Sequence, residues 1–197
     1  RIAGDGEILV KGPNVFRGYR GRPEATAEAL QDGWLHSGDL GRIDEDGFIY
    51  VTGRKKDLLI TSGGKNISPG NIEADLMNLP LVEHAVVIGD SRHFLSALLT
   101  LKPDVLQAFA QQHQIPGGPA EWARSSPVQE ELKRGIDAVN ARQARVAHVR
   151  KFSVLQSAFT IDNGCLTPTQ KIRRNVVQRQ YPEEIEALYR DGSSAQH

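Results

Sequence analysis

The pattern of apolar and polar positions along the chain predicts short strands and helices in alternation. Apolar runs of strand type lie at Glu7 to Lys11, Ala85 to Ile88 and Ala97 to Leu101. The last two are apolar runs without a clean alternation, joined by a turn at Gly89 to Arg92. We therefore expect both to be buried in a sheet that is covered by helices.

Helices are predicted where apolar residues recur every three or four positions. A short helix is expected from Pro23 to Leu30. A second helix begins at Pro69, after the capping residue Ser68, and ends at Pro80. A third helix begins at Pro103.

A fourth helix is expected to begin with a capping box that Ser126 and Gln129 form around Pro127. Its buried face carries Val128, Leu132, Ile136 and Val139. A basic region follows the helix, made of Arg142, Arg145, Arg150 and Lys151. Either a solvated helix end or a docking place for anionic phosphates accounts for these charges.

The segment from Gly33 to Leu40 is rich in glycine and is expected to be too irregular for one element. It leads into a hairpin with strands at Leu40 to Asp44 and Phe48 to Thr52 around a turn at Glu45 to Gly47. Asp39 stands where the irregular segment meets the hairpin. Its carboxylate suits the paired hydroxyls of a ribose, although the amides of a turn would satisfy it as well.

The stretch from Gly53 to Ile72 combines three features. Three consecutive cations lie where the chain leaves one sheet and enters another, which suits anion binding and hinge motion; they are Arg54, Lys55 and Lys56. After the apolar run Leu58 to Ile60, Ser62 to Gly64 must turn through conformations that favour glycine. The glycines also allow another molecule to approach the main chain. A basic hairpin leading into an ordinary helix would have the same residues.

Strand character resumes from Phe152 to Ile161, and Asn163-Gly164 favours a type I′ hairpin with a return strand at Cys165 to Thr167. Lys171 lies just past this hairpin, at the start of a helix that contains Ile172, Val176 and Val177. A lysine on a short, anchored loop can hold a positive charge near a developing anion. An exposed lysine that only faces solvent remains the alternative. The last residues, Ser193 to His197, are expected to be a frayed tail.

Composition narrows the classes of function. The chain of 197 residues has 24 basic and 24 acidic residues, which argues against a general nucleic-acid binder. The one cysteine, Cys165, allows no internal disulfide, so a reducing, cytoplasmic location is expected. No apolar run approaches the roughly 18 to 20 residues that span a bilayer. The six histidines lack metal-ligand spacing, so no metal site is expected.

Three segments, in this order, resemble the AMP-forming acyl-CoA synthetases, the adenylate-forming family that includes firefly luciferase. They are GPNVFRGYRGRPEAT with GWLHSGDLG, then GRKKDLLITSGGKNISP with NIEADL, then LTPTQKIRR. The likeness covers the chain from about Gly6 to Tyr189. The form LTPTQK and the additional helical segment around Gly117 to Arg145 are similar to the long-chain fatty acid branch.

The resemblance implies an α+β fold. A small C-terminal domain with a mixed sheet flanked by helices would occupy residues 58–197 and rotate about a hinge at residues 54–57. Residues 1–53 would be a β-hairpin remnant of the large N-terminal domain. The chain also begins at Arg1 without Met, so a fragment of a longer protein is expected.

The family forms acyl-AMP and pyrophosphate from a carboxylate and ATP, and CoA thiol then displaces AMP. The resemblance implies that Asp39 binds the ribose hydroxyls, that Arg54 contacts the nucleotide ribose or phosphate, and that Lys56 is the hinge residue. Lys171 would be the catalytic residue that bridges the fatty carboxylate and the α-phosphate. The pantetheine path of CoA would be lined by Gly63, Gly64 and Lys65.

The implied ligands are ATP with Mg²⁺, CoA and a long-chain fatty acid. Magnesium would be bound mainly by the missing N-terminal domain, which carries the phosphate loop and the aromatic ATP motif that this sequence lacks. The fragment alone is therefore expected to be inactive.

Three other assignments stay open. The first is that the parent protein is an acyl-AMP ligase, and the second is that it is an adenylation domain that loads a carrier protein. The third is that the chain is a non-enzymatic module that binds anionic ligands. Peripheral contact with a membrane through the basic region is also left open by the sequence.

Overall fold

The computed structural model describes residues 1–190, so the expected frayed tail lies outside the described residues. The chain divides into two compact units, the first from Arg1 to Leu58 and the second beginning at Leu59. The predicted hinge falls at the end of the first unit, where Lys55–Asp57 form the short 3-10 helix η1. Its role as a hinge stays a prediction.

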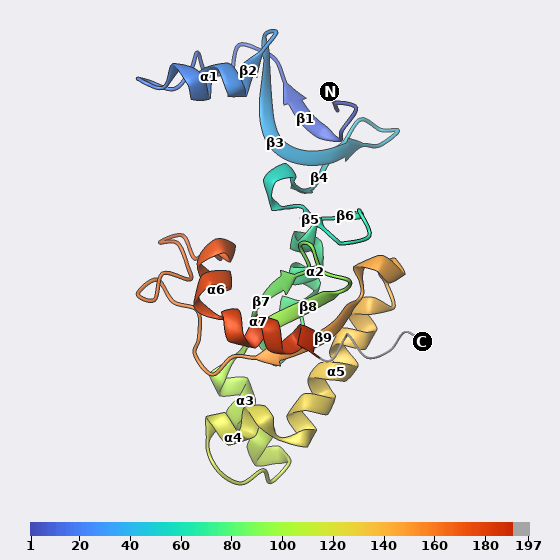
Figure 1. Cartoon of the computed structure of the whole chain (residues 1–197), viewed down its shortest axis with the longest axis vertical. Coiled ribbons are helices and arrows are strands. Elements are labelled where there is room, and N and C mark those ends of the chain that lie inside the picture. The colour runs from blue at the N-terminus through green and yellow to red at the C-terminus, as the bar shows by residue number, and fades with distance from the viewer. Residues whose placement is uncertain (191–197) are drawn as a thin grey trace. The chain divides into compact units, whose positions relative to one another are not determined.

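The first unit is a four-stranded antiparallel sheet with one short helix (Figure 1). The long strand β3 pairs with each of the other three strands. The predicted first strand and first helix are confirmed to within one residue. The elements are β1 (Glu7–Val10), α1 (Pro23–Ala29), β2 (Leu30–Gln31), β3 (Trp34–Ile43) and β4 (Ile49–Arg54).

The expectation that residues 33–40 form no single element is wrong, because β3 runs through them. Gly38 adopts a left-handed φ of 72° inside the strand, and the register with β4 shifts just before Gly41. A Cβ at Gly41 would lie 2.6 Å from the carbonyl oxygen of Tyr50. The glycines thus allow a bulge and a close strand approach without ending the strand. Asp39 consequently lies inside a strand.

The predicted hairpin is confirmed as β3 and β4, but much of its apolar surface is bare. Large apolar side chains of the hairpin are 44% to 66% exposed, namely Ile43, Phe48, Ile49, Tyr50 and Val51. Only Ile8 and Leu9 are buried apolar residues among the described residues of this unit. A sheet with bare apolar residues ordinarily packs against a further layer.

The second unit contains a mixed sheet with the strand order β7-β8-β9. Strands β7 (Val82–Ile88) and β8 (Leu95–Leu101) are antiparallel, whereas β8 and β9 (Val149–Val154) are parallel. The crossover from β8 to β9 contains α3 (Pro103–Gln112), α4 (Pro119–Arg124), α5 (Ser126–Asn140) and the 3-10 turn η2 (Arg145–Ala147). The remaining helices are α2 (Pro69–Met77), α6 (Arg174–Gln180) and α7 (Pro182–Tyr189). The predicted α+β fold class is confirmed.

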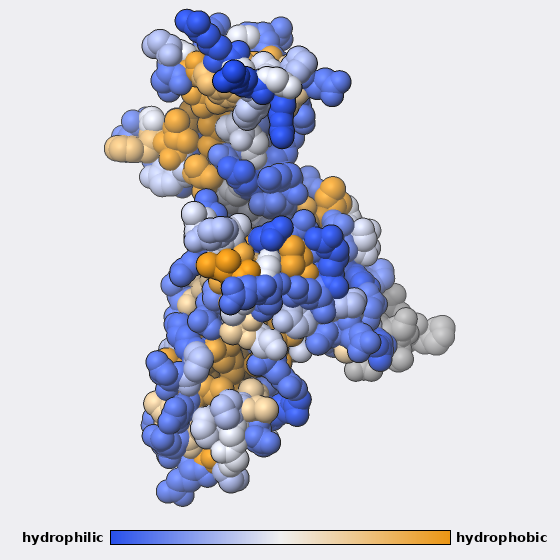
Figure 2. All heavy atoms as spheres, turned by 90° about the vertical axis from the view of Figure 1, so that its left-hand side faces the viewer, coloured by the Kyte–Doolittle hydropathy of each residue, from blue (hydrophilic) through white to orange (hydrophobic). Residues whose placement is uncertain are grey.

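Both faces of this sheet are buried. Ala85 and Val87 of β7 belong to a core cluster with residues of α2 and α5, whereas Val86 and Ile88 belong to a second cluster with residues of α6 and α7. Alternate side chains of one strand therefore enter two different cores, which is why residues 85–88 of β7 are all apolar. On the face that Figure 2 shows, hydrophilic residues cover most of the surface.

Helix α5 has the predicted buried face, but the predicted capping box is wrong. Ser125 occupies the N-cap position, so the helix begins one residue earlier than expected. The Gln129 side chain instead donates a hydrogen bond to the carbonyl of Ala123 at 2.6 Å. The four predicted apolar residues are all at most 3% exposed: Val128, Leu132, Ile136 and Val139.

Strands β5 (Leu59–Ile60) and β6 (Asn66–Ile67) pair antiparallel ahead of α2. Pro69 opens α2 as predicted, and Ser68 occupies its N-cap position. Of the two predicted turn glycines, only Gly64 has a left-handed φ, 71°.

The C-terminal segment contains less strand than predicted. Strand β9 ends at Val154, and residues 155–161 leave the sheet because Leu155 and Phe159 enter the core beside α6 and α7. The predicted return strand at 165–167 is wrong, since this segment contributes only an isolated bridge between Leu166 and Ile172.

The predicted type I′ turn is also wrong. That turn needs positive φ at both central residues, but of the pair only Gly164 has a positive φ, 75°. The Asn163 side-chain oxygen instead accepts the amide hydrogens of Thr160 and Cys165, at 3.0 and 3.1 Å. The asparagine thus stabilises a loop in which the flanking strands need not pair.

Candidate functional site

Lys171 lies on a tight loop, residues 167–171, which we call the lysine loop. The amide of Thr167 donates to the carbonyl of Lys171 at 2.8 Å, and the Thr167 hydroxyl accepts the amide of Lys171 at 3.0 Å. Gln170 closes the turn with a left-handed φ of 60° and donates its amide to the Thr167 carbonyl at 2.8 Å. The Lys171 side chain is exposed, so its ammonium group is available to a ligand.

The lysine loop is tied at its base. Leu166 and Ile172 form a bridge on its two sides, and the amide of Arg173 donates to the carbonyl of Cys165 at 2.7 Å. Helix α6 begins only at Arg174. The expectation that Ile172 belongs to this helix is therefore wrong. Lys171 therefore lies on the bridged turn, three residues ahead of the helix.

The predicted CoA-path residues lie on the turn between β5 and β6, residues 61–65, which we call the glycine loop. The amide of Gly64 donates to the carbonyl of Thr61 at 2.8 Å, and the amide of Lys65 donates to the Thr61 hydroxyl at 3.2 Å. Gly63 has ordinary backbone dihedrals, and a Cβ there would meet nothing closer than 3.9 Å. Of the two glycines in this loop, only Gly64 is thus required by the backbone conformation.

The turn between β7 and β8 supports the glycine loop. The amide of Ser62 donates to the carbonyl of Arg92 at 3.0 Å, and the Ser62 hydroxyl lies 2.8 Å from Nδ1 of His93. Arg92 also pairs with Glu186 of α7 and lies 4.6 Å from the centre of the Tyr189 ring. The glycine loop is consequently anchored to the rim of the sheet.

Asp39 and Arg54, predicted separately as nucleotide-binding residues, are neighbours in the structure. They face each other across β3 and β4, and Nε of Arg54 lies 2.8 Å from Oδ1 of Asp39. The side chains are 53% exposed for Arg54 and 29% for Asp39. An accessible carboxylate beside a guanidinium group can bind both the hydroxyls and the phosphate of a nucleotide.

A buried carboxylate that sequence reasoning missed lies beside this pair. Oε2 of Glu7 is 3.0 Å from Nδ1 of His36 and 3.2 Å from Nζ of Lys55, and Oε1 accepts the amide of Gly38 at 2.9 Å. Burial by itself would raise the pKa of Glu7, but these hydrogen bonds together hold its pKa below the ordinary value. Glu7 thus stays ionised and fixes the backbone next to Asp39.

The Glu7 cluster borders a hollow of about 700 Å³ in the first unit. Its lining includes Arg54 and Lys56, the predicted hinge residue, together with Tyr19 and Arg22 from the segment that leads into α1. Lys56 is exposed. The first unit therefore presents Arg54, predicted to bind the nucleotide, and Lys56, predicted to be the hinge residue, on one hollow surface.

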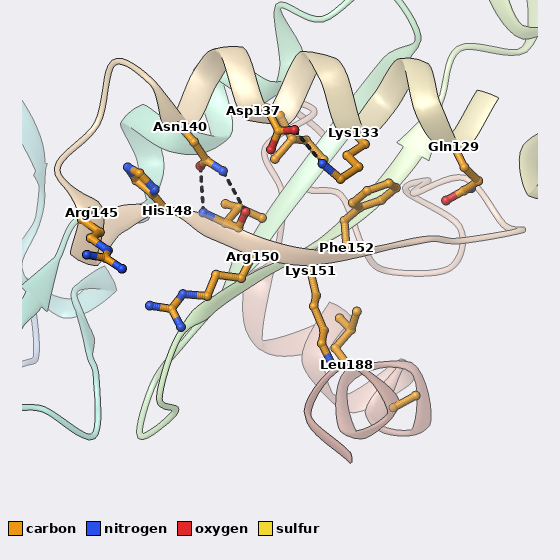
Figure 3. Close-up of a pocket in the computed structure, with 13 residues that line it drawn as sticks. Gln129, Lys133, Asp137, Asn140, Arg145, His148, Arg150, Lys151, Phe152 and Leu188 are labelled. Atoms are coloured by element: carbon orange, nitrogen blue, oxygen red, sulfur yellow. Dashed lines mark hydrogen bonds and ion pairs between the residues drawn. The ribbon is translucent and has the colours of Figure 1, made fainter. Parts of the chain in front are cut away.

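The second unit has a hollow of about 660 Å³ between α5, β9 and α7, which we call the basic hollow (Figure 3). Three of the four cations of the predicted basic region line it: Arg145, Arg150 and Lys151. None of the three forms an ion pair within residues 1–190. The fourth, Arg142, instead lies 4.0 Å from Asp75 of α2.

Other features give no further chemistry. Cys165 is fully buried, its Sγ lies 3.0 Å from Oε1 of Gln180, and burial raises the pKa of its thiol. No cluster of three or more metal-ligating side chains occurs among the described residues. None of the described helices is both long and apolar enough to span a bilayer.

Comparison with known proteins places these residues in a family context. The family described as AMP-binding enzyme C-terminal domain matches residues 56–193. The sequence is 41% identical to the long-chain-fatty-acid–CoA ligase FadD15 of Mycobacterium tuberculosis over 96% of this chain and 32% of that protein. It is also 41% identical to the long-chain-fatty-acid–CoA ligase ACSBG1 of Mus musculus, over 95% of this chain and 29% of that protein. The chain thus spans about a third of the length of these curated relatives.

Solved structures give the same picture. The adenylation domain of a carboxylate reductase from Mycobacterium chelonae matches 94% of this chain and 28% of its own, with a TM-score of 0.78 and 26% identity. The o-succinylbenzoate CoA synthetase of Bacillus subtilis, solved with its acyl-adenylate intermediate, matches 87% of this chain and 30% of its own, with a TM-score of 0.63 and 31% identity.

Proposed function

Because the chain belongs to the family of AMP-binding enzyme C-terminal domains, we propose that it is the C-terminal part of a long-chain fatty acid–CoA ligase. The parent enzyme converts a long-chain fatty acid, ATP and CoA into acyl-CoA, AMP and pyrophosphate through acyl-AMP. The observation that carries the proposal is the 41% identity to long-chain-fatty-acid–CoA ligases across both units of the chain.

In this proposal, Lys171 is the catalytic residue of the first half-reaction. The lysine loop holds an exposed ammonium group on a turn with four internal hydrogen bonds. Little reorganisation is then needed when negative charge grows on the fatty carboxylate and the α-phosphate. The fixed positive charge favours the transition state over the ground state.

The proposed nucleotide contacts are those of Asp39 and Arg54. The carboxylate of Asp39 accepts hydrogen bonds from the ribose hydroxyls. Arg54 keeps that carboxylate oriented and contacts the ribose or phosphate of the nucleotide. The described residues contain no cluster that would hold Mg²⁺. In the proposal, the metal is bound with the ATP phosphates mainly by the rest of the N-terminal domain.

The bare apolar residues of the first unit support a larger N-terminal domain as the partner of this chain. Phe48 and Val51 on the β3–β4 hairpin are 66% and 64% exposed. We propose that the remaining N-terminal domain covers them in the parent enzyme, because burial of such side chains is worth about 1.5 to 3 kcal/mol each.

The acceptor thiol is the point on which two assignments differ. One structural neighbour is an adenylation domain solved together with a peptidyl carrier protein domain, so a carrier-protein thiol is the second candidate. The curated relatives named as CoA ligases favour CoA.

The decisive experiment uses the full-length parent protein with palmitate, ATP and Mg²⁺. We expect acyl-CoA and AMP to accumulate with CoA as the acceptor. Transfer only to a phosphopantetheinylated carrier protein would support the second candidate. Absence of pyrophosphate release with any fatty acid tested would overturn the proposal for both acceptors.

The two glycines of the glycine loop give a matched pair of variants. Gly63→Ala has room and ordinary dihedrals, so we expect the stability of the chain to change by less than about 0.5 kcal/mol. Gly64→Ala must adopt a φ of +71° and should destabilise the loop by about 1 to 2 kcal/mol. Urea unfolding of both variants measures this difference.

In the full-length enzyme, Gly63→Ala should slow thioester formation from pre-made acyl-AMP while pyrophosphate release stays normal, because the added methyl group narrows the proposed pantetheine path. Normal thioester formation by the folded Gly63→Ala variant would contradict the placement of CoA at this loop.

We further propose a cytoplasmic enzyme that contacts membranes peripherally through the basic hollow. Three cations without ion-pair partners among the described residues could face anionic headgroups, each contributing about 1 kcal/mol near such a surface. We expect the chain to sediment with vesicles of phosphatidylcholine that contain about 30% phosphatidylglycerol, and not with phosphatidylcholine alone.

The combined variant Arg145→Gln, Arg150→Gln, Lys151→Gln should reduce this partitioning by on the order of a hundredfold. Its control removes the same charge from three exposed arginines elsewhere: Arg17→Gln, Arg20→Gln and Arg124→Gln. Equal losses in the two variants would show that net charge, and not the basic hollow, causes the binding.

A further inference from the structure

An ion pair inside the second unit connects the helix after the lysine loop to the sheet. Nη2 of Arg174 lies 2.6 and 2.7 Å from the two carboxylate oxygens of Glu73. Glu73 is buried, at 8% exposure, and the Arg174 side chain is 23% exposed. These residues lie on α6 and α2, 101 positions apart in the sequence.

The pair also binds both backbone groups of one residue of the sheet. Oε1 of Glu73 accepts the amide hydrogen of Val87 at 2.7 Å, and Nη1 of Arg174 donates to the Val87 carbonyl at 2.7 Å. Val87 belongs to β7, at the antiparallel edge of the sheet. The three residues therefore form a closed ring of charge-assisted hydrogen bonds, which we call the Glu73–Arg174 clamp.

The position of Arg174 gives the clamp its significance. Arg174 is the first residue of α6, and only Ile172 and Arg173 separate it from Lys171. The hydrogen bonds within the lysine loop are local and join Thr167 to Thr169, Gln170 and Lys171. They shape the loop, and the clamp ties the loop to the sheet, so loss of the clamp frees the loop to open.

A guanidinium group suits this task better than an apolar contact or a lysine. Its planar fork can bond to a carboxylate and a carbonyl at the same time, which sets direction as well as distance. A buried ion pair contributes little net stability compared with an apolar pair of similar size. Its value here is the orientation that it imposes on the start of α6.

We propose that Arg174 and Glu73 are positioning residues for Lys171: through the backbone amide and carbonyl of Val87 they hold the lysine loop at a set place on the sheet, so that the ammonium group meets the reacting carboxylate and phosphate. This inference rests on the proposed role of Lys171. The part that concerns loop position alone can be tested without catalysis.

The first experiment measures amide hydrogen exchange by NMR in the chain itself. Arg174→Gln should raise the exchange rates of the Thr167 and Lys171 amides at least tenfold, while the Leu98 amide in β8 keeps its protection. Arg173→Gln is the matched control, because Arg173 is exposed and, within residues 1–190, its guanidinium group hydrogen-bonds to the carbonyl of Gly164 at 3.4 Å and to no carboxylate. Unchanged exchange at Thr167 and Lys171 in a folded Arg174→Gln variant would overturn the proposal.

Two milder variants keep the test decisive if Arg174→Gln does not fold. Glu73→Gln retains an acceptor for the Val87 amide but removes the charge, and Arg174→Lys retains the charge but loses the fork. Both should give exchange rates between those of the wild type and a fully released loop. Wild-type exchange rates in both variants would contradict the clamp.

The second experiment uses the full-length enzyme and separates position from general stability. In Arg174→Gln, kcat for pyrophosphate release should fall at least tenfold with little change in KM for ATP, whereas thioester formation from pre-made acyl-AMP should stay within about twofold. Arg174→Lys should restore part of the adenylation rate. Equal loss of both half-reactions would indicate a merely structural role.

The two experiments also separate this inference from the proposed function. If Arg174→Gln speeds exchange of the loop amides but does not change adenylation, the clamp does position the loop, and the proposed catalytic role of Lys171 is wrong. If Arg174→Gln leaves exchange of the loop amides unchanged while Lys171→Ala abolishes adenylation, the clamp proposal is wrong and the proposed function stands.

Discussion

Replacement of Lys171 by alanine in the full-length parent is expected to lower pyrophosphate release by on the order of a hundredfold or more, because one fixed charge at the developing anion is lost. The substitution should not disturb the fold. Lys171 is exposed, and its two loop hydrogen bonds use the backbone, which alanine retains. Thioester formation from pre-made acyl-AMP should survive, since the charge acts only in the first half-reaction.

The measurement is pyrophosphate release with palmitate, ATP and Mg²⁺, followed by acyl transfer from synthetic acyl-AMP. Lys133→Ala is the matched control, since Lys133 is an exposed lysine of the same unit that pairs with Asp137 at 2.8 Å on α5. If Lys171→Ala and Lys133→Ala enzymes adenylate equally well, the central assignment of the site fails.

The second large effect is expected at Asp39. Asp39→Ala should raise KM for ATP by about 10- to 150-fold, because a hydrogen bond to a charged group is worth about 1.5 to 3 kcal/mol. Folding should be nearly unaffected. The pair with Arg54 lies on the surface of the first unit, and such pairs contribute about 0 to 1 kcal/mol.

Initial rates at varied ATP concentration provide the test for Asp39. Asp46→Ala serves as the control, since Asp46 is an exposed carboxylate on the neighbouring turn. Stability of both variants should be compared by urea unfolding. A KM for ATP that is the same in Asp39→Ala and the wild type would remove Asp39 from the nucleotide site.

Much of the second unit follows from local patterns. The runs at β7 and β8 and the apolar stripe of α5 were recognisable because burial on both faces or on one helical stripe imposes a simple period on the sequence. The start of α2 was recognisable from Pro69, since proline suits the first helical turn.

The errors have a common cause in contacts between distant segments. β3 passes through Gly38 because strands β1, β2 and β4 supply its hydrogen bonds. Residues 155–161 leave the sheet because Leu155 and Phe159 find a better apolar environment beside α6 and α7. A local propensity scale contains neither the ladder partners nor the second core.

The candidate site shows the same division. The residue types of Asp39, Arg54 and Lys171 were suggestive from the sequence, and their motifs identified the family. That Asp39 and Arg54 touch across two strands, and that Glu7 supports the backbone beside them, was not predicted. A lone glutamate at the start of a strand has no sequence signal that distinguishes it from a solvated one.

The sequence by itself therefore determined the family, the α+β class and the loops to which we assign the chemistry, because those depend on short-range period, glycine and proline positions, and motif order. The tertiary structure alone decided which side chains meet: the Asp39–Arg54 pair, the Glu7 cluster and the clamp that joins Glu73 to Arg174. These contacts join residues between 14 and 101 positions apart. Their geometry is set by how the strands and helices pack, which no local pattern records.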